Sequence, residues 1–298
     1  MFRLTGILPA LVTPFDEADD VNFTVLRDLI EWQIDGGVSG FYILGSTGQG
    51  LLLTEAERRA VAQAVVEQVK GRVPVVVHVG ALTTRAACDL AAHAAEIGAD
   101  ATSSIPPFYF NVGPEGVRQY YLRVAAASPL PFYIYNIPGS TGVDVAVDLV
   151  RELIAAVPNL RGMKYTAYDL YTMRKVIELD EGRFNVLSGA DEVMIAAQAM
   201  GADGAIGTTE NILPRVFVQA YAAFRGGEVK RAEDLQAKIN WTISTFLAFP
   251  AHAATKEILR LLGFNCGSPR PPLMPLNDSQ RGRIREMLEE ISFFQWAG

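Results

Sequence analysis

The sequence predicts an α/β fold in which eight strand–helix units form a (β/α)8 TIM barrel over residues 1–225, with a C-terminal helical appendix over residues 226–298. Short apolar runs alternate with longer amphipathic stretches through the first part of the chain. Glycines stop several helical stretches just before the next apolar run, and the strand pattern ends at Arg225-Gly-Gly227. A doubly wound open sheet is the alternative, which is disfavoured because no Gly-x-Gly-x-x-Gly follows the first strand.

Eight apolar runs are predicted to be strands, and helical patterns lie between them. The runs are Gly6–Val12, Gly40–Leu44, Val73–Val79, Ala101–Ser104, Phe132–Asn136, Leu160–Tyr165, Phe184–Ser188 and Gly204–Ile206. One helix is expected to begin at Glu55, because Thr54 can cap it and acidic residues fill its first turn. Further helices are expected to begin near Thr83, Pro114, Asp144 and Asp191.

The appendix is predicted to be helical with one interruption, the proline-rich strap from Gly267 to Pro275. Because proline is not tolerated in a helix interior, this strap should be extended. It leads to a last helix that Asp278 or Ser279 should cap. No low-complexity linker precedes the appendix, so we expect it to pack on the barrel.

The composition argues against several classes of function. Lysines and arginines number 26 and acidic residues 33, for a net charge of −7, and no basic stripe points to a nucleic-acid partner. Cys88 and Cys266 lie far apart, which favours reduced thiols, and the three histidines show no metal-ligand spacing. No charged start precedes an apolar stretch, and no apolar run is long enough to span a bilayer. We therefore expect a soluble, cytoplasmic protein with no metal and no membrane partner.

Lys164 is the most informative residue, because it lies inside the mostly apolar run Leu160–Thr166. Burying an unpaired ammonium is costly, and desolvation of a lysine favours the neutral amine, which attacks carbonyls and forms a Schiff base. Another apolar run carries Tyr135, which could serve as the proton-transfer partner. The alternative is a lysine at the exposed end of an ordinary strand.

In a barrel of this kind the chemistry lies at the C-terminal ends of the strands, so those ends predict a site. Gly45-Ser46-Thr47-Gly48 follows the second strand, and its backbone N–H groups suit a carboxylate, although a generic βα turn would look similar. The other strand ends carry Tyr109, Tyr135, Lys164 to Thr166, Gly189 to Glu192, and Thr208. Asp191 and Glu192 have a simpler explanation as well, since acidic residues favour a helix start.

These motifs together resemble the pyruvate-dependent class I aldolase family of dihydrodipicolinate synthase and N-acetylneuraminate lyase. The resemblance rests on Gly-Ser-Thr-Gly, Tyr135-Asn-Ile-Pro138, the strand lysine, the Gly204-x-x-Gly-Thr208 turn and the strap, in order along the whole chain. It implies that Lys164 forms a Schiff base with pyruvate and that no other cofactor takes part.

The resemblance also implies roles for the remaining residues at the strand ends. Tyr135 would shuttle a proton, Ser46 and Thr47 would bind the pyruvate carboxylate, and Thr47 would relay to Tyr135. Tyr109 would complete the site of a neighbouring subunit, in a homotetramer built as a dimer of dimers, and Ile206 would form the apolar wall near pyruvate.

The features that distinguish family members favour the lyase. The synthase carries an arginine shortly after its Tyr-Asn-x-Pro motif, whereas Ser140 stands here and cannot supply a bidentate cation. Gly189, Asp191, Glu192, Thr166 and Thr208 match or approach the positions at which lyases hold a sugar tail.

Two residues depart from the family pattern: Gln49 replaces a glutamate after the Gly-Ser-Thr-Gly turn, and Glu210 stands where lyases have an aromatic residue. The leading expectation is cleavage of a 2-keto-3-deoxy sugar acid, with N-acetylneuraminate first, to pyruvate and an aldehyde such as N-acetylmannosamine. A 2-keto-3-deoxygluconate-type aldolase, the synthase itself and a non-catalytic keto-acid-binding barrel remain as alternatives.

Overall fold

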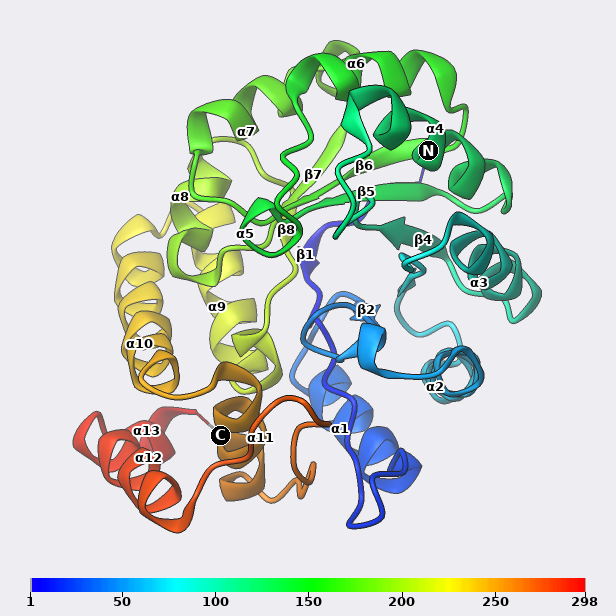
Figure 1. Cartoon of the computed structure of the whole chain (residues 1–298). Helices are drawn as coiled ribbons and strands as arrows, with labels where there is room; N and C mark the ends of the chain where they lie inside the picture. Colours follow the sequence, from blue (N-terminus) through cyan, green and yellow to red (C-terminus); the bar gives the residue numbers. More distant parts are fainter. Residues whose placement is uncertain (1, 298) are drawn as a thin grey trace.

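The computed structural model describes residues 2–297, and its centre is one curled sheet of eight parallel strands in the order β1-β8-β7-β6-β5-β4-β3-β2. Figure 1 shows the helices arranged around the outside of this sheet. The strands are β1 (Gly6–Ile7), β2 (Phe41–Ile43), β3 (Val75–His78), β4 (Ala101–Ser104), β5 (Phe132–Asn136), β6 (Leu160–Tyr165), β7 (Asn185–Ser188) and β8 (Gly204–Ala205). Because the strand order never reverses, the doubly wound alternative is wrong.

The two edges of the sheet meet over a short stretch beyond β1. A parallel bridge joins Ala10 to Tyr42 of β2. The Tyr42 N–H donates to the Pro9 carbonyl at 3.0 Å, and the Leu11 N–H donates to the Tyr42 carbonyl at 2.9 Å. Asn211 strengthens the same corner, since its Nδ2 donates to the Ala10 carbonyl at 2.7 Å.

Thirteen α-helices and four short 3₁₀ helices lie within residues 2–297. The α-helices are α1 (Phe23–Asp35), α2 (Glu55–Val69), α3 (Thr84–Glu96), α4 (Gly113–Ala126), α5 (Pro138–Thr141), α6 (Val147–Ala156), α7 (Leu170–Ile177), α8 (Met194–Ala199), α9 (Pro214–Arg225), α10 (Val229–Leu247), α11 (Ala251–Leu261), α12 (Asp278–Glu290) and α13 (Phe293–Trp296). The 3₁₀ helices are η1 (Gly50–Leu52), η2 (Asp180–Gly182), η3 (Asp191–Val193) and η4 (Thr209–Asn211). None of these helices is long and apolar enough to cross a bilayer.

The helix starts follow the capping signals with two exceptions. Thr54 caps α2 as predicted, and its side chain accepts from the Glu57 N–H while Glu57 reaches back to the Thr54 N–H. The prediction that Asp278 or Ser279 caps α12 is wrong, because Asn277 accepts from the Gln280 N–H at 2.9 Å in a reciprocal capping box. The helix expected near Asp144 begins three residues later, and the Asp144 carboxylate instead accepts from Asn136 Nδ2 at 2.9 Å.

Alternation along the strands gives the sheet an outer and an inner apolar face. In β5, Phe132 and Ile134 belong to the large cluster that packs against the helices. Tyr133 and Tyr135 belong to a smaller cluster that also contains Tyr42. Because side chains alternate across a strand, the smaller cluster is the inner face of the curled sheet.

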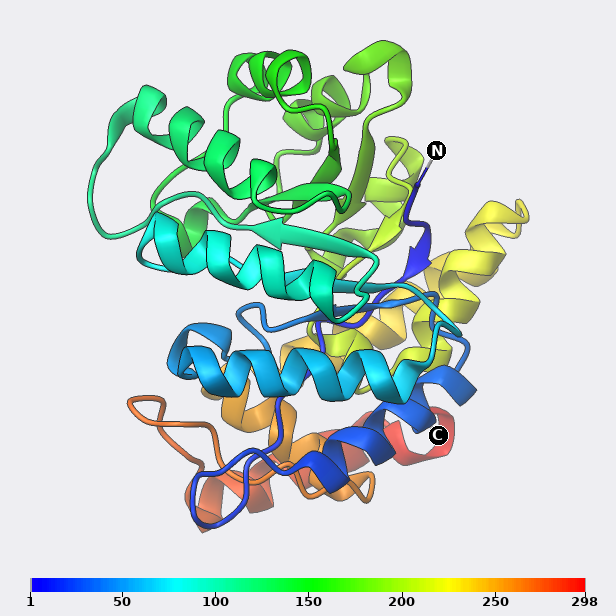
Figure 2. The ribbon, with the colours of Figure 1, turned by 90° about the vertical axis from the view of Figure 1, so that its right-hand side faces the viewer.

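The C-terminal helices lie at the same end of the molecule as α1 in both views, where the chain is coloured orange to red (Figures 1 and 2). Phe264, between α11 and the strap, packs at a tilt against Trp32 of α1 with ring centroids 5.0 Å apart.

The strap is fastened to the turn after β2 through Arg270. The Arg270 N–H donates to Gln49 Oε1 at 2.8 Å, and its guanidinium forms ion pairs with Asp19 at 3.2 Å and Glu57 at 2.8 Å. This contact accounts for Gln49, which is buried and serves as an acceptor for the strap.

Candidate active site

Lys164 lies on the inner face of the curled sheet and is only 4% exposed. Parallel pairing sets it beside Tyr135 of β5 and Leu187 of β7. Its Nζ lies 4.3 Å from the centroid of the Tyr135 ring and 4.6 Å from that of the Tyr42 ring. The alternative of a lysine at the exposed end of a strand is therefore wrong, and the predicted lysine–tyrosine pair is in contact.

Two aromatic rings lie against the lysine amine, and the sequence predicted only one of them, Tyr135. Tyr42 and His78 both pack edge-on against Tyr135, with centroids 5.6 and 5.9 Å from it. Burial raises the pKa of Tyr42 well above its usual range, and the neighbouring Tyr135 raises it further, so Tyr42 stays a neutral phenol that donates to Ser103 Oγ at 3.0 Å. Tyr42 was missed because a tyrosine in a buried strand resembles ordinary core.

His78 is neutral and structural. Burial, followed by the charge of Arg58, lowers its pKa to about 3. Nδ1 lies 3.1 Å from the Leu44 carbonyl oxygen, and Nε2 accepts from the Ile105 N–H at 3.3 Å. Its ring therefore supports Tyr135 without supplying a charge.

The turn after β2 carries the two predicted hydroxyls in different settings. Ser46 is exposed, whereas Thr47 is buried and its Oγ1 lies 2.7 Å from Oγ1 of Thr208. Thr13 Oγ1 supports the turn from below by donating to the Gly48 carbonyl at 2.7 Å. Within residues 2–297 no hydrogen bond joins Thr47 to Tyr135, and the threonine instead connects the ends of β2 and β8.

Beyond β7, a glycine leaves room beside the lysine. A Cβ on Gly189 would lie 1.9 Å from Thr166 Oγ1 and 3.2 Å from Lys164 Cε, so a side chain at this position would require Thr166 to move. Thr166 Oγ1 is buried and has no hydrogen-bond partner among the described residues. A free hydroxyl therefore lies close to the lysine stem.

Asp191 and Glu192 follow in η3, and the structure gives them different settings. Asp191 is 7% exposed, and its Oδ2 accepts from the N–H and Oγ1 of Thr209 at 2.9 and 2.5 Å. Burial raises its pKa from 3.8 to about 6 despite these two donors. Glu192 is half-buried and accepts from the Tyr168 hydroxyl at 3.1 Å. Both residues lie in the first turn of η3, as the helix-start explanation predicts, and Asp191 is also bonded to the turn after β8.

Helix α10 holds the η3 turn from outside. Gln236 Nε2 donates to the Asp191 carbonyl at 2.9 Å, and Asn240 Nδ2 donates to the Glu192 carbonyl at 3.2 Å. The first helix of the appendix thus orients this part of the candidate site.

Three other predicted residues are placed as follows. Ile206 is buried in the inner apolar cluster with Tyr42 and Tyr135. Ser140 is exposed in α5. Tyr109 lies outside the lysine cluster, the group formed by Lys164, Tyr135 and Tyr42; it is 84% exposed and packs edge-on against Phe110, with centroids 4.9 Å apart.

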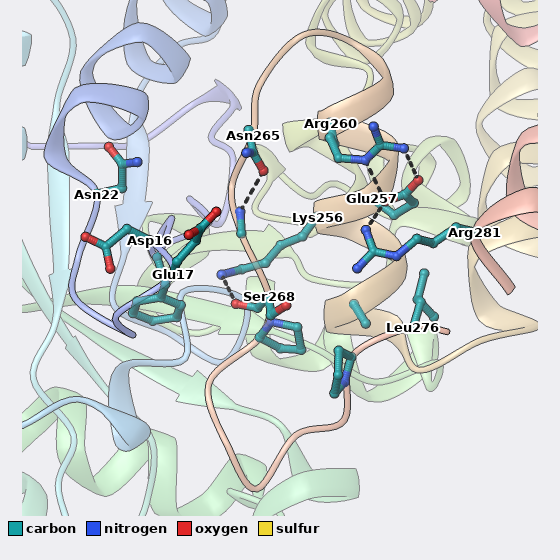
Figure 3. A pocket seen from close by; sticks show the side chains of 15 residues that line it. Asp16, Glu17, Asn22, Lys256, Glu257, Arg260, Asn265, Ser268, Leu276 and Arg281 are labelled. Atoms are coloured by element: carbon teal, nitrogen blue, oxygen red, sulfur yellow. Dashed lines mark hydrogen bonds and ion pairs between the residues drawn. The ribbon is translucent and has the colours of Figure 1, made fainter. Parts of the chain in front are cut away.

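A cavity of about 490 Å³ lies elsewhere, between the segment after β1, α11 and the strap (Figure 3). Lys256 lines it and donates to the carbonyls of Cys266 and Ser268 at 3.1 and 3.0 Å. Burial lowers the pKa of Lys256 to about 7. Glu257 lies between Arg260 and Arg281, with which it forms ion pairs of 2.6 and 3.1 Å. These groups are mutually satisfied, and the cavity is separate from the lysine cluster.

The lysine cluster has the parts that carbonyl chemistry requires. A buried primary amine can add to a keto carbon, an adjacent phenol can move protons, and a hydroxyl-rich turn can hold a carboxylate. Between residues 2 and 297 no three His, Cys, Asp or Glu side chains come together as a metal site.

Comparison with known proteins identifies the family of this chain. The sequence model of the "Dihydrodipicolinate synthetase family" matches residues 3–291. The 4-hydroxy-tetrahydrodipicolinate synthase of Methanopyrus kandleri is 31% identical over 100% of this chain and 99% of its own, and the N-acetylneuraminate lyase of Rattus norvegicus is 34% identical over 99% and 95%. The solved structure of N-acetylneuraminate lyase from Aliivibrio salmonicida superposes with a TM-score of 0.93 at 32% identity, covering 98% of each chain.

The relatives thus carry both enzyme names, while the match extends over nearly the full length of each. The chain belongs to the dihydrodipicolinate synthetase family, whose members are pyruvate-dependent class I aldolases and carbon–carbon lyases.

Proposed function

We propose that this enzyme is a Schiff-base aldolase of the lyase type, which cleaves a 2-keto-3-deoxy sugar acid to pyruvate and an aldehyde. N-Acetylneuraminate, giving N-acetylmannosamine, is the leading substrate. The observation that carries the proposal is the contact between the buried Lys164 amine and the Tyr135 ring on the inner face of the sheet.

The proposed chemistry proceeds through a covalent imine. The Lys164 amine adds to the keto carbon and water leaves, which gives an iminium. Tyr135 relays the proton from the C4 hydroxyl as the C3–C4 bond breaks. The electrons of that bond form the carbon–carbon double bond of an enamine, and the iminium nitrogen of Lys164 accepts the electrons of the carbon–nitrogen double bond. Protonation of the enamine at C3 and hydrolysis then release pyruvate and regenerate the amine.

Substrate binding is proposed to divide between two ends of the site. Ser46 and Thr47 hold the pyruvate carboxylate, with Thr208 supporting Thr47 across the 2.7 Å hydroxyl contact. Ile206 forms the apolar wall. At the other end Thr166, Gly189, Asp191 and Glu192 face the sugar tail.

The lyase assignment rests on charge. A tail rich in hydroxyls supplies donors to Asp191 and Glu192, and each charge-assisted bond contributes about 1.5–3 kcal/mol. The synthase reaction requires a cation for the carboxylate of aspartate semialdehyde, and Ser140 supplies none. Because several relatives carry the synthase name, the synthase reaction is the second candidate.

The same proposal extends to assembly and architecture. The exposed Tyr109 and Phe110 present apolar surface that a neighbouring subunit would cover, in a homotetramer of two tight dimers. The curled sheet would close as a complete (β/α)8 barrel over residues 1–225, with 226–298 as the helical domain, in a cytoplasmic enzyme.

Borohydride trapping with pyruvate, followed by peptide mapping, tests the chemistry. The reduced pyruvyl group is expected on Lys164 and not on Lys256, the other buried lysine, whose Nζ is already bonded to two carbonyls. Failure to trap pyruvate would favour the non-catalytic keto-acid-binding barrel. Steady-state assays with N-acetylneuraminate, 2-keto-3-deoxygluconate and aspartate semialdehyde then identify the substrate, and a preference for aspartate semialdehyde would contradict the lyase assignment.

A further inference from the structure

Glu210 is a buried carboxyl group that the proposed chemistry does not use. It lies in η4, directly after the β8 turn, and is 0% exposed. Neither of its carboxylate oxygens meets a donor at hydrogen-bond geometry among the described residues. An ionised carboxylate in such a setting is strongly destabilising, because four acceptor sites lose water without replacement.

Asp191 shares this corner of the molecule. Its Oδ1 is also buried without a hydrogen-bond partner, whereas Oδ2 accepts twice from Thr209. A Cβ on Gly207 would lie 1.6 Å from Asp191 Oδ1, so the glycine makes room for the carboxylate. The corner therefore contains two buried carboxyl groups with three orphan oxygens between them.

The charges around the pair indicate how many protons it holds. Burial raises the pKa of Glu210 well above its usual range, and the charge of Asp191 raises it further. The Gly207 N–H and Lys164 act in the opposite direction with smaller effects, and Glu192 adds negative charge on the Asp191 side. Two coupled carboxyl groups in one dry site do not both ionise near neutral pH.

The location of the proton follows from the donors. Thr209 gives Asp191 two hydrogen bonds that stabilise its ionised form, whereas the Gly207 N–H is the donor that acts on Glu210, and it lies outside hydrogen-bond geometry. We infer that Asp191 and Glu210 hold one proton between them near neutral pH, that Glu210 carries it, and that Glu210 thereby acts as a positioning residue which keeps Asp191 an anionic acceptor beside Lys164.

A consequence for specificity rests on the proposed function. If Asp191 faces the substrate tail, a fixed anion there accepts from hydroxyl groups and repels a carboxylate. The buried pair would then select aldehydes with hydroxyl-rich tails.

Infrared spectroscopy tests the proton directly. A neutral carboxylic acid has a C=O stretch that is distinct from carboxylate bands. At neutral pH this band is expected in the unmodified protein, absent in Glu210→Gln, and retained in the matched control Glu192→Gln, which changes a half-exposed carboxylate next to Asp191. No acid band at neutral pH, or a band that survives in Glu210→Gln, would overturn the inference.

Isotope labelling of the unmodified protein gives a second test, which does not depend on whether the Glu210→Gln variant folds. In the unmodified protein, ¹³C labelling of glutamate carboxyl groups should shift the band, and labelling of aspartate carboxyl groups should leave it in place. The reverse result would assign the proton to Asp191 and refute the assignment to Glu210. Failure of the proposed function would appear instead as absent turnover of every sugar acid, with the infrared result unchanged.

Discussion

Replacing Asp191 with asparagine should stabilise the protein while impairing recognition of the sugar tail. Burial holds the pKa of Asp191 at about 6 instead of 3.8. A folded-state pKa above the unfolded value contributes stability that is fully present below pH ~4 and is lost as pH rises through ~6. The shift of about two pKa units then corresponds to a cost of about 3 kcal/mol at pH ~8 and roughly half of that at pH ~5.

Asparagine keeps the geometry and removes this cost. Its amide oxygen can still accept from the Thr209 N–H and hydroxyl, which Asp191 Oδ2 now binds. Asp191→Asn should therefore gain up to about 3 kcal/mol of unfolding free energy at pH ~8, and the gain should shrink at lower pH.

Urea unfolding of both proteins at one protein concentration, at the two pH values, measures this difference. Glu192→Gln is the matched control, because the same change on a half-exposed carboxylate should give no comparable gain. A difference that does not change with pH would show that the destabilisation is not ionic and would refute the reasoning. In steady-state assays Asp191→Asn should lose roughly 10-fold or more in kcat/KM for a long sugar acid and should still trap pyruvate.

Other variants probe the remaining parts of the site. Lys164→Ala should abolish borohydride trapping of pyruvate, and trapping at the native rate without Lys164 would contradict the nucleophile assignment. The control Lys175→Ala removes an exposed lysine that also lies over a tyrosine ring, at 4.2 Å, and should leave trapping intact. Tyr135→Phe should keep pyruvate binding and lose roughly 10²–10⁴-fold in turnover, measured by stopped-flow or steady-state assay, and unchanged turnover would eliminate the proton relay. Gly189→Ala should displace Thr166 and slow imine formation, because the added Cβ would lie 1.9 Å from Thr166 Oγ1. A native trapping rate would show that Thr166 can move aside without affecting Lys164. Light scattering should give a tetramer, and a fully active monomer would contradict the role of Tyr109.

The sequence predicted the strands best where no proline interrupts them. β4, β5 and β6 have the predicted bounds. β1 was predicted to extend to Val12 but ends at Ile7, because Pro9 lacks the N–H that a ladder requires. Since parallel strands end at one edge, Tyr135 and Gly189 lie beside Lys164 as the strand ends predicted, whereas Tyr109 does not.

Contacts between distant segments could not be predicted in this way. Tyr42 lies in an apolar strand, and no pattern in that strand distinguishes it from the other core residues. Asp191 and Glu210 lie in the same corner although they are far apart in the sequence. Asp191 is bonded to Thr209, which lies 18 positions further along the chain and next to Glu210, and no periodic pattern in the sequence predicts this contact. Gln49, noted as a departure from the family pattern, is explained by an acceptor bond to Arg270, 221 residues further along the chain.

The fastening of Arg270 to Gln49 also bears on the order in which the protein can be completed during synthesis. The turn after β2 leaves the ribosome early, but its partner in the strap is made only near the end of translation. Domains usually fold as units while the chain emerges. Here the eight strands can assemble first, yet the turn that carries Ser46 and Thr47 reaches its final support only when residue 270 arrives. Chains released prematurely between β8 and the strap should therefore contain a turn that keeps its bonds to Thr13 and Thr208 but lacks the one to Arg270.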